Sequence, residues 1–209
     1  FGMDAVVWFT GVEGAVLMTD DPARVQGLLR EVEEAVSGGL KAAGFVTYEA
    51  ASGMDRALCS HPRGKLPLAW FTLFRDVEEM DALPAAGGTC RMGPWTPSVT
   101  REQYDRNIAR IRRYLREGDT YQVNYTLRMK TACEGNPYAF FLLLQEAQNA
   151  PYGAYIETGS HAICCASPEL FFRLRGADIE SKPMKGTRGR GLTWEQDEEN
   201  RTGLAASEK

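Results

Sequence analysis

Residues 153–183 read GAYIETGSHAICCASPELFFRLRGADIESKP and contain three short runs of apolar, aromatic or β-branched residues, followed by the more polar stretch DIESKP. Gly159-Ser160, Pro168 and Gly176 separate these segments. Short runs of this kind, bounded by turn-forming residues, are typical of β-strands. Their short connections favour antiparallel pairing, because a parallel pair needs a long crossover. The predicted strands are 153–158, 161–166, 170–174 and 178–183.

Helices are expected between the strand clusters, and their first residues carry capping signals. Thr100 with Gln103 forms a capping box, in which each side chain accepts a hydrogen bond from the other residue's backbone. Thr193 with Gln196 forms a second capping box. The four predicted helices begin at Asp21-Pro22, Thr100, Asn136-Pro137 and Thr193, and the first of them ends at Gly38-Gly39.

Further strands are expected at 4–9 and 14–18, joined as a hairpin, and at 44–50, 66–75 and 120–131. Strands clustered in hairpins with helices between the clusters predict an α+β fold of mainly antiparallel sheets and packed helices. A connection rich in Pro and Gly covers 80–99. It favours a division into an N-terminal region, 1–99, and a second domain that begins at residue 100 and runs to 209.

Composition excludes several classes of function. The chain has 209 residues, a net charge of −4 and 25% charged residues, so bulk electrostatics do not favour nucleic acid as a partner. No apolar run is long enough to span a bilayer. The five cysteines fit no metal-binding spacing, which favours reduced thiols over disulfides or metal ligands. These observations predict a cytoplasmic protein that is not a membrane protein.

Residues 181–191, SKPMKGTRGRG, form a loop with four cationic side chains: Lys182, Lys185, Arg188 and Arg190. One interpretation is a solvated basic turn. The other is a site where cations, the Thr187 hydroxyl and glycine backbone amides bind the carboxylates of a substrate. Pro183 restricts the backbone just before Lys185, which favours an ordered loop.

Glu169 lies in the motif SPELF (167–171), at the start of an apolar strand. A glutamate in this position is either a rim charge or an acid suited to proton transfer, and the residues alone leave the two equal. The second polar candidate is the predicted strand at 120–131. Gln122 and Asn124 lie on one of its faces, where they would bind a substrate or simply face solvent.

Three motifs occur in order: EGDTYQVNYT (117–126), SPELF (167–171) and PMKGTRGRG (183–191). Together they resemble the chorismate-utilising enzymes, and within that family most closely the aminodeoxychorismate synthase component I group. The segment GFVTYEAASGMD (44–55) is similar to that group as well. The resemblance covers nearly the whole chain and is strongest from residue 100 onward.

The resemblance implies a fold like the N-terminal portion of anthranilate synthase component I. It also implies conversion of chorismate and ammonia to 4-amino-4-deoxychorismate, on the route to p-aminobenzoate and folate. Lys185 would attack C2 of the ring, and Glu169 would protonate the departing C4 hydroxyl. The lysine must be neutral to react, and neighbouring cations and partial burial would favour that form. The residues expected to bind the substrate are Gly186, Thr187, Gln122 and Ser167.

Two alternatives remain at this point. Anthranilate synthase component I carries alanine at the position of Lys185, so the lysine disfavours it. The isochorismate and salicylate synthases carry a water-activating lysine at the position of Gln122. Because this chain has an amide there, direct activation of water at C2 is disfavoured as well. A non-catalytic fragment or tryptophan-binding module is the other alternative.

The implied cofactor is Mg²⁺, and the implied partner is a glutamine amidotransferase subunit that supplies ammonia. In the family, the glutamates that bind magnesium follow the position of Lys209. No metal ligand is therefore assigned among these residues. The helix that begins at Thr193 has no terminating residue, which predicts a fragment that is inactive alone.

Overall fold

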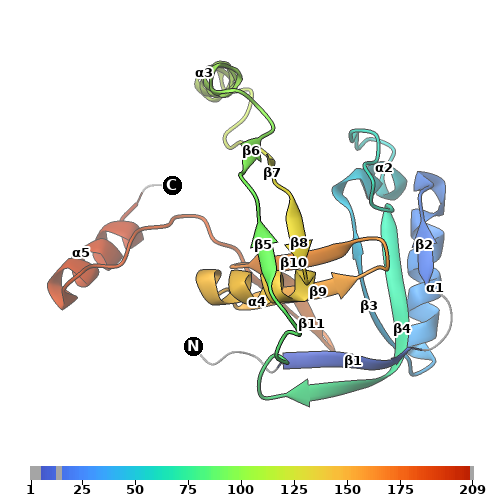
Figure 1. The fold of residues 1–209 in the computed structure, drawn as a ribbon. Coiled ribbons are helices and arrows are strands. Elements are labelled where there is room, and N and C mark those ends of the chain that lie inside the picture. Colours follow the sequence, from blue (N-terminus) through green and yellow to red (C-terminus); the bar gives the residue numbers. More distant parts are fainter. Residues whose placement is uncertain (1–5, 13–15, 208–209) are drawn as a thin grey trace. The chain divides into compact units, whose positions relative to one another are not determined.

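The computed structural model describes residues 6–12 and 16–207. These residues form two compact units: the first consists of the residues before 86 and after 140, and the second is Ala86–Phe140. The α+β prediction is confirmed, since small antiparallel sheets and helices make up both units (Figure 1). The predicted division at residue 100 stays a prediction.

The largest sheet of the first unit has four strands, and three of them pair with the fourth, the long strand β4 (Ala69–Met80). β3 (Lys41–Val46) pairs with residues 69–74 of β4, and β2 (Leu17–Thr19) pairs with residues 69–71. β1 (Val6–Val12) pairs with the remaining part of β4, from Met80 back to Phe74. All three pairings are antiparallel.

The hairpin predicted between 4–9 and 14–18 is wrong in its pairing. β1 and β2 pair with β4 and not with each other. Val12 is opposite Phe74, and Leu17 is opposite Phe71, so the two strands follow one another along β4. The long strand β4 offers pairing positions for both, which a comparison of neighbouring residues alone does not reveal. The predicted turn includes residues 13–15, which lie outside the described residues.

Helix α1 (Val25–Ser37) supplies the core of this unit. Asp21 accepts a hydrogen bond from the backbone of Ala23 at 2.9 Å and begins a 3-10 turn, η1 (Pro22–Arg24), that leads into the helix. The helix ends at Gly38, as predicted. Its buried side chains Val25, Leu28 and Val32 pack against the sheet and its flanking residues. Burial of each such side chain stabilises the fold by roughly 1.5–3 kcal/mol.

The strand predicted at 44–50 ends early. β3 stops at Val46, and the chain continues into a 3-10 turn, η2 (Tyr48–Ala50), and a single helical turn, α2 (Ala51–Met54). Ala50 is completely buried and packs with Val25 and Leu68. The end of this strand is therefore fixed by a tertiary contact.

The remaining part of the first unit contains two hairpins, as predicted. β9 (Tyr152–Glu157) pairs with β10 (Ala162–Ser167), and β11 (Leu170–Arg175) pairs with β12 (Asp178–Lys182). Both pairings are antiparallel, and Gly159 and Gly176, in the two turns, have positive φ angles of 82° and 59°. Helix α5 (Trp194–Ala205) follows the second hairpin. Helix α4 (Pro137–Gln148) begins in the second unit and continues into the first.

The second unit contains helix α3 (Arg101–Glu117) and two short strand pairs. The capping box predicted for Thr100 and Gln103 is confirmed, with backbone-to-side-chain distances of 2.8 and 3.2 Å. β5 (Cys90–Met92) pairs with β8 (Cys133–Gly135), and β6 (Thr96–Pro97) pairs with β7 (Met129–Lys130). Together they form a two-stranded ribbon that leads to α3 and back (Figure 1).

The strand predicted at 120–131 is wrong over most of its length. Only Met129 and Lys130 are in a strand, and residues 121–128 are irregular. A strand requires a neighbour to pair with, and among the described residues only β6 pairs with this segment. No helix in the described parts of the chain is both long and apolar enough to cross a membrane.

Candidate active site

The two motifs SPELF and PMKGTRGRG meet because of the β11–β12 hairpin. Leu170, the first residue of β11, is opposite Lys182, the last residue of β12. Glu169 just before β11 and Met184 just after β12 are therefore neighbours. The carboxylate Oε1 of Glu169 accepts a hydrogen bond from the backbone N–H of Met184 at 2.7 Å. Since Lys185 follows Met184, this bond ties Glu169 to the lysine loop.

Ser167 fixes the backbone of Glu169. Its hydroxyl donates to the carbonyl oxygen of Glu169 at 3.0 Å and accepts from the backbone N–H of Glu169 at 3.2 Å. Local hydrogen bonds of this kind are how serine stabilises turns. In this structure the Ser167 hydroxyl therefore holds the turn between β10 and β11, and the proposed role in substrate binding stays a prediction.

Two of the four loop cations are paired with carboxylates. Lys182 Nζ lies 2.9 Å from Glu180, and Arg190 lies 2.7 Å from Asp197. The hydrogen bond that Lys182 donates to Glu180 raises the pKa of Lys182 and lowers the pKa of Glu180. Within the described residues, Lys185 has no ion-pair partner. Its amine is therefore available for an external ligand.

Helix α5 orders the second half of the loop. Asp197 Oδ1 accepts from Arg190 Nε at 2.7 Å and from the Gly191 backbone N–H at 2.9 Å. Asn200 donates to the carbonyl of Gly189 at 3.0 Å. A Cβ added to Gly186 would lie 2.9 Å from a methyl carbon of Leu204, so glycine permits this close approach. The loop is thus packed on a helix, which disfavours the interpretation as a simple solvated turn.

Sequence reasoning identified this loop but missed the residues that order it. The backbone of Met184 and the side chains of Asp197 and Asn200 were not among the candidates. One signal in the sequence could have identified Asp197: it is an acidic residue in the first turn of a helix that directly follows a basic loop. The predicted Thr193 box forms only half: Gln196 N–H donates to Thr193 at 3.3 Å, but the Gln196 side chain bonds Leu192.

Residues 81–209 match the family described as chorismate binding enzyme. The chain belongs to this family. It is 30% identical over 158 residues to the aminodeoxychorismate synthase component 1 of Bacillus subtilis (strain 168), covering 76% of this chain and 33% of that relative. It is 35% identical over 115 residues to the protein of that name in Escherichia coli (strain K12), with coverages of 55% and 25%.

Relatives in the chorismate-binding family also include anthranilate synthases. The anthranilate synthase component 1 of Acetivibrio thermocellus is 32% identical over 114 residues, covering 54% of this chain and 23% of the relative. The chain therefore spans about a third or less of the length of these relatives. The resemblance stated from the three motifs is confirmed at the level of the family.

The predicted site residues of this family member lie in both units. Glu169, Ser167 and the loop carrying Lys185, Gly186 and Thr187 belong to the first unit. Their roles stay predictions. The expected partial burial of Lys185 is wrong for this chain, because its side chain is exposed. Among the described residues, the contacts of this loop with α5 involve Gly186, Gly189, Arg190 and Gly191 and not Lys185.

Gln122 belongs to the second unit. Its side-chain amide lies 3.5 Å from the Asn124 oxygen, so the two amides share one side of their segment, as predicted. Both side chains are exposed. Since the segment is irregular, this arrangement comes from the local hydrogen bond and not from a strand.

A magnesium site needs several oxygen ligands, such as carboxylates, close together. No group of three or more His, Cys, Asp or Glu side chains that could hold a metal ion occurs in the part of the chain that the structure describes. The carboxylates nearest the loop are already bonded, Glu169 to Met184 and Asp197 to Arg190. The described residues do not fit a magnesium site.

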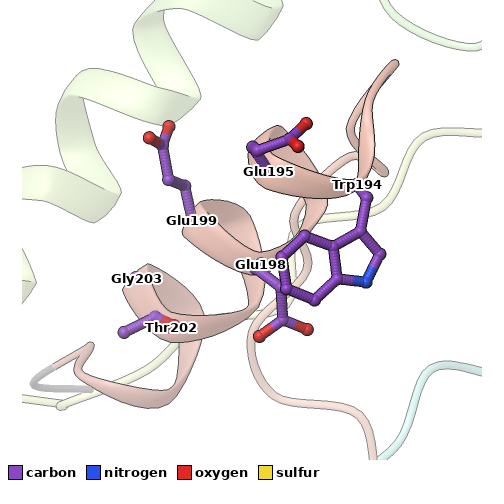
Figure 2. A pocket seen from close by; sticks show the side chains of 6 residues that line it. All are labelled: Trp194, Glu195, Glu198, Glu199, Thr202 and Gly203. Carbon is purple, nitrogen blue, oxygen red and sulfur yellow. The ribbon is translucent and has the colours of Figure 1, made fainter.

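Figure 2 shows an open hollow on one face of α5. It is lined by Trp194, Glu195, Glu198, Glu199, Thr202 and Gly203. Glu198 forms an ion pair with Arg201 at 2.6 Å, and the hydrogen bond from Arg201 lowers the pKa of that carboxyl. Three glutamates in the lining repel an anionic ligand such as chorismate. The lysine loop, with its cations, is the better candidate for the site.

Proposed function

We propose that the full-length protein converts chorismate and ammonia to 4-amino-4-deoxychorismate through a covalent adduct on Lys185. The single observation that best supports this is the 2.7 Å hydrogen bond from Met184 to Glu169. It holds a carboxyl group next to a lysine that has no ion-pair partner among the described residues. An acid beside an unpaired amine is the arrangement that nucleophilic displacement of a hydroxyl group requires.

In the first half-reaction, the lone pair of neutral Lys185 forms a bond to C2 of the ring. The two ring double bonds shift, and the bond between C4 and its hydroxyl oxygen breaks. Glu169 in its protonated form donates a proton, so the hydroxyl group leaves as water. Without that proton the leaving group would be hydroxide, which departs poorly.

In the second half-reaction, ammonia forms a bond to C4. The double bonds shift back, the bond between C2 and the lysine nitrogen breaks, and Lys185 is regenerated as a neutral amine. A proton from the new ammonium group returns to Glu169. The sum is chorismate plus ammonia giving the amino product plus water.

The loop supplies groups suited to the two carboxylates of chorismate. Arg188 has no ion-pair partner among the described residues. Its guanidinium lies against Gly203 of α5, where a larger residue would collide with it. Thr187 supplies a hydroxyl. Gly186 has no side chain, so a ligand can approach its backbone N–H closely. Charge-assisted hydrogen bonds from such donors orient a carboxylate.

Gln122 is an amide and cannot act as a base, which supports ammonia rather than activated water as the attacking group. We propose a glutamine amidotransferase subunit as the ammonia source, magnesium bound by residues other than those the structure describes as the cofactor, and a cytoplasmic role in p-aminobenzoate and folate synthesis. The names of the aminodeoxychorismate synthase relatives support this assignment.

Anthranilate formation is the second candidate, because anthranilate synthase relatives match with similar identity. The identity of the reaction product distinguishes the two candidate functions. Full-length protein should be incubated with chorismate, magnesium and an ammonium salt, and the products should be identified by chromatography and mass. We expect 4-amino-4-deoxychorismate with ammonium and no amino product without it. Anthranilate as the sole product would assign the second candidate instead.

A further inference from the structure

Two cysteines lie in contact at the base of the ribbon in the second unit. Cys90 begins β5 and Cys133 begins β8, and their Sγ atoms are 3.0 Å apart. Cys90 Sγ also lies 3.8 Å from the sulfur of Met92. Neither cysteine takes part in the chorismate chemistry proposed above, so this inference does not rest on it.

The pairing of the strands explains the contact. Cys133 is opposite Met92, and Cys90 is opposite Gly135, so the cysteines occupy diagonal positions on one face of the ladder. The right-handed twist of paired strands brings one of the two diagonals close together. Gly135, opposite Cys90, has a φ of 105°, and a Cβ added to it would meet the backbone of Thr89 and Cys90. A disulfide needs the sulfurs at about 2.05 Å, which is roughly 1 Å closer than they are here.

The two thiols differ in their access to solvent. Cys133 is exposed, whereas Cys90 is half-buried. Oxidants attack exposed thiols first, and a second thiol nearby then resolves the product. Cys59 is exposed as well but lies in the first unit, which makes it a suitable comparison.

We propose that Cys90 and Cys133 form a reversible disulfide on exposure to hydrogen peroxide. Peroxide oxidises the Cys133 thiol to a sulfenic acid, and one molecule of water leaves. The Cys90 thiol then attacks the Cys133 sulfur, the bond between that sulfur and oxygen breaks, and a second water leaves. Two thiols are oxidised and one peroxide is reduced. A dithiol reductant reverses the reaction by thiol–disulfide exchange.

The bond closes a loop that contains most of the second unit. Residues 91–132 include α3 and the Gln122 segment, and they are held at their base by the short strands β5 and β8. A two-stranded ribbon is marginally stable by itself. A crosslink at its base restricts the unfolded chain and therefore protects the loop from opening.

Peptide mapping under non-reducing conditions tests the proposal on the full-length protein. After brief treatment with peroxide, a peptide pair containing Cys90 and Cys133 should appear, and a reductant should remove it. Proteolytic cleavage within the paired strands β6 and β7, which requires the ribbon to open, should slow by about tenfold on oxidation. Cys59→Ser should behave like the parent protein. Absence of the linked pair while Cys59 is oxidised would overturn the proposal.

Two single substitutions test the assigned roles. In Cys90→Ser, the sulfenic acid on Cys133 has no resolving thiol, so dimedone should label Cys133 strongly. In Cys133→Ser, the half-buried Cys90 should take up little dimedone. Equal labelling in the two variants would contradict the assigned order of events. Circular dichroism of the reduced variants checks that both remain folded.

Discussion

The carboxylate of Glu169 accepts a hydrogen bond from the backbone N–H of Met184, with the two atoms 2.7 Å apart. This bond connects the turn before β11 to the residue just before Lys185. It gives Glu169 two separable properties, an oxygen that positions the loop and an acidic proton that a carboxamide lacks. Substitutions can remove one property without the other.

Glu169→Gln retains an oxygen that accepts from Met184 but cannot donate an acidic proton. Turnover of chorismate by the full-length protein should fall by roughly 10²–10⁴-fold, with little change in chorismate affinity. Glu169→Ala should also increase hydrogen exchange at the Met184 amide. Glu180→Gln, a change to a carboxylate on the neighbouring strand, is the control and should stay within a few-fold of the parent. Parental turnover in Glu169→Gln would leave Glu169 only a positioning role.

Local sequence signals predicted the helix caps and the two hairpins of residues 152–182, because caps and tight turns depend on near neighbours. The pairing of β1 and β2 with β4 was not predicted, since it depends on residues 50 or more positions away. The segment 120–131 has strand-like composition but lacks a paired neighbour along most of its length. For the site, motifs indicated side chains, whereas the backbone donor Met184 has no sequence signature.

Gly191 allows the loop to approach α5 closely. A Cβ at this position would lie 2.8 Å from the Cα of Asp197 and closer still to its backbone nitrogen. Gly191→Ala should therefore displace the loop from the helix and lower the free energy of unfolding by about 1–3 kcal/mol. Gly189→Ala is the matched control, since its added Cβ meets nothing within 4 Å. Urea unfolding measures the free energy of unfolding of both variants. Equal values for the two would show that the loop can move away from α5 without loss of stability.

Asp197 makes the packing of the loop on α5 sensitive to pH. The hydrogen bond from Arg190, followed by the Gly191 amide, lowers the pKa of the Asp197 carboxyl. A lowered pKa means that the contact is stabilised at pH values above the ordinary aspartate pKa and weakens as the pH falls through the lowered one. Protection of the Gly191 amide from hydrogen exchange should thus be constant near neutrality and decrease below about pH 4.

Asp197→Asn separates the charge from the hydrogen bond. The asparagine oxygen can still accept from Gly191, but the pairing with Arg190 loses its charge, so protection should be lower and independent of pH between about 3 and 7. Glu198→Gln changes a carboxylate that pairs with Arg201 instead and should keep the parental pH profile. The same pH profile in Asp197→Asn as in the parent would assign the transition to another group.

Lys185 is the loop amine that can add to a ring carbon and leave again, because arginine remains protonated and Lys182 is paired with Glu180. Lys185→Ala should abolish the covalent adduct seen by intact mass after mixing with chorismate, and should sharply reduce formation of the amino product. Some ammonia should then add at C2, shifting the product towards anthranilate. Lys185→Arg should be less active than Lys185→Ala, because its side chain is bulky, charged and non-nucleophilic. Lys182→Ala should keep the adduct; an adduct that persists in Lys185→Ala would return residues 181–191 to the interpretation of a basic turn.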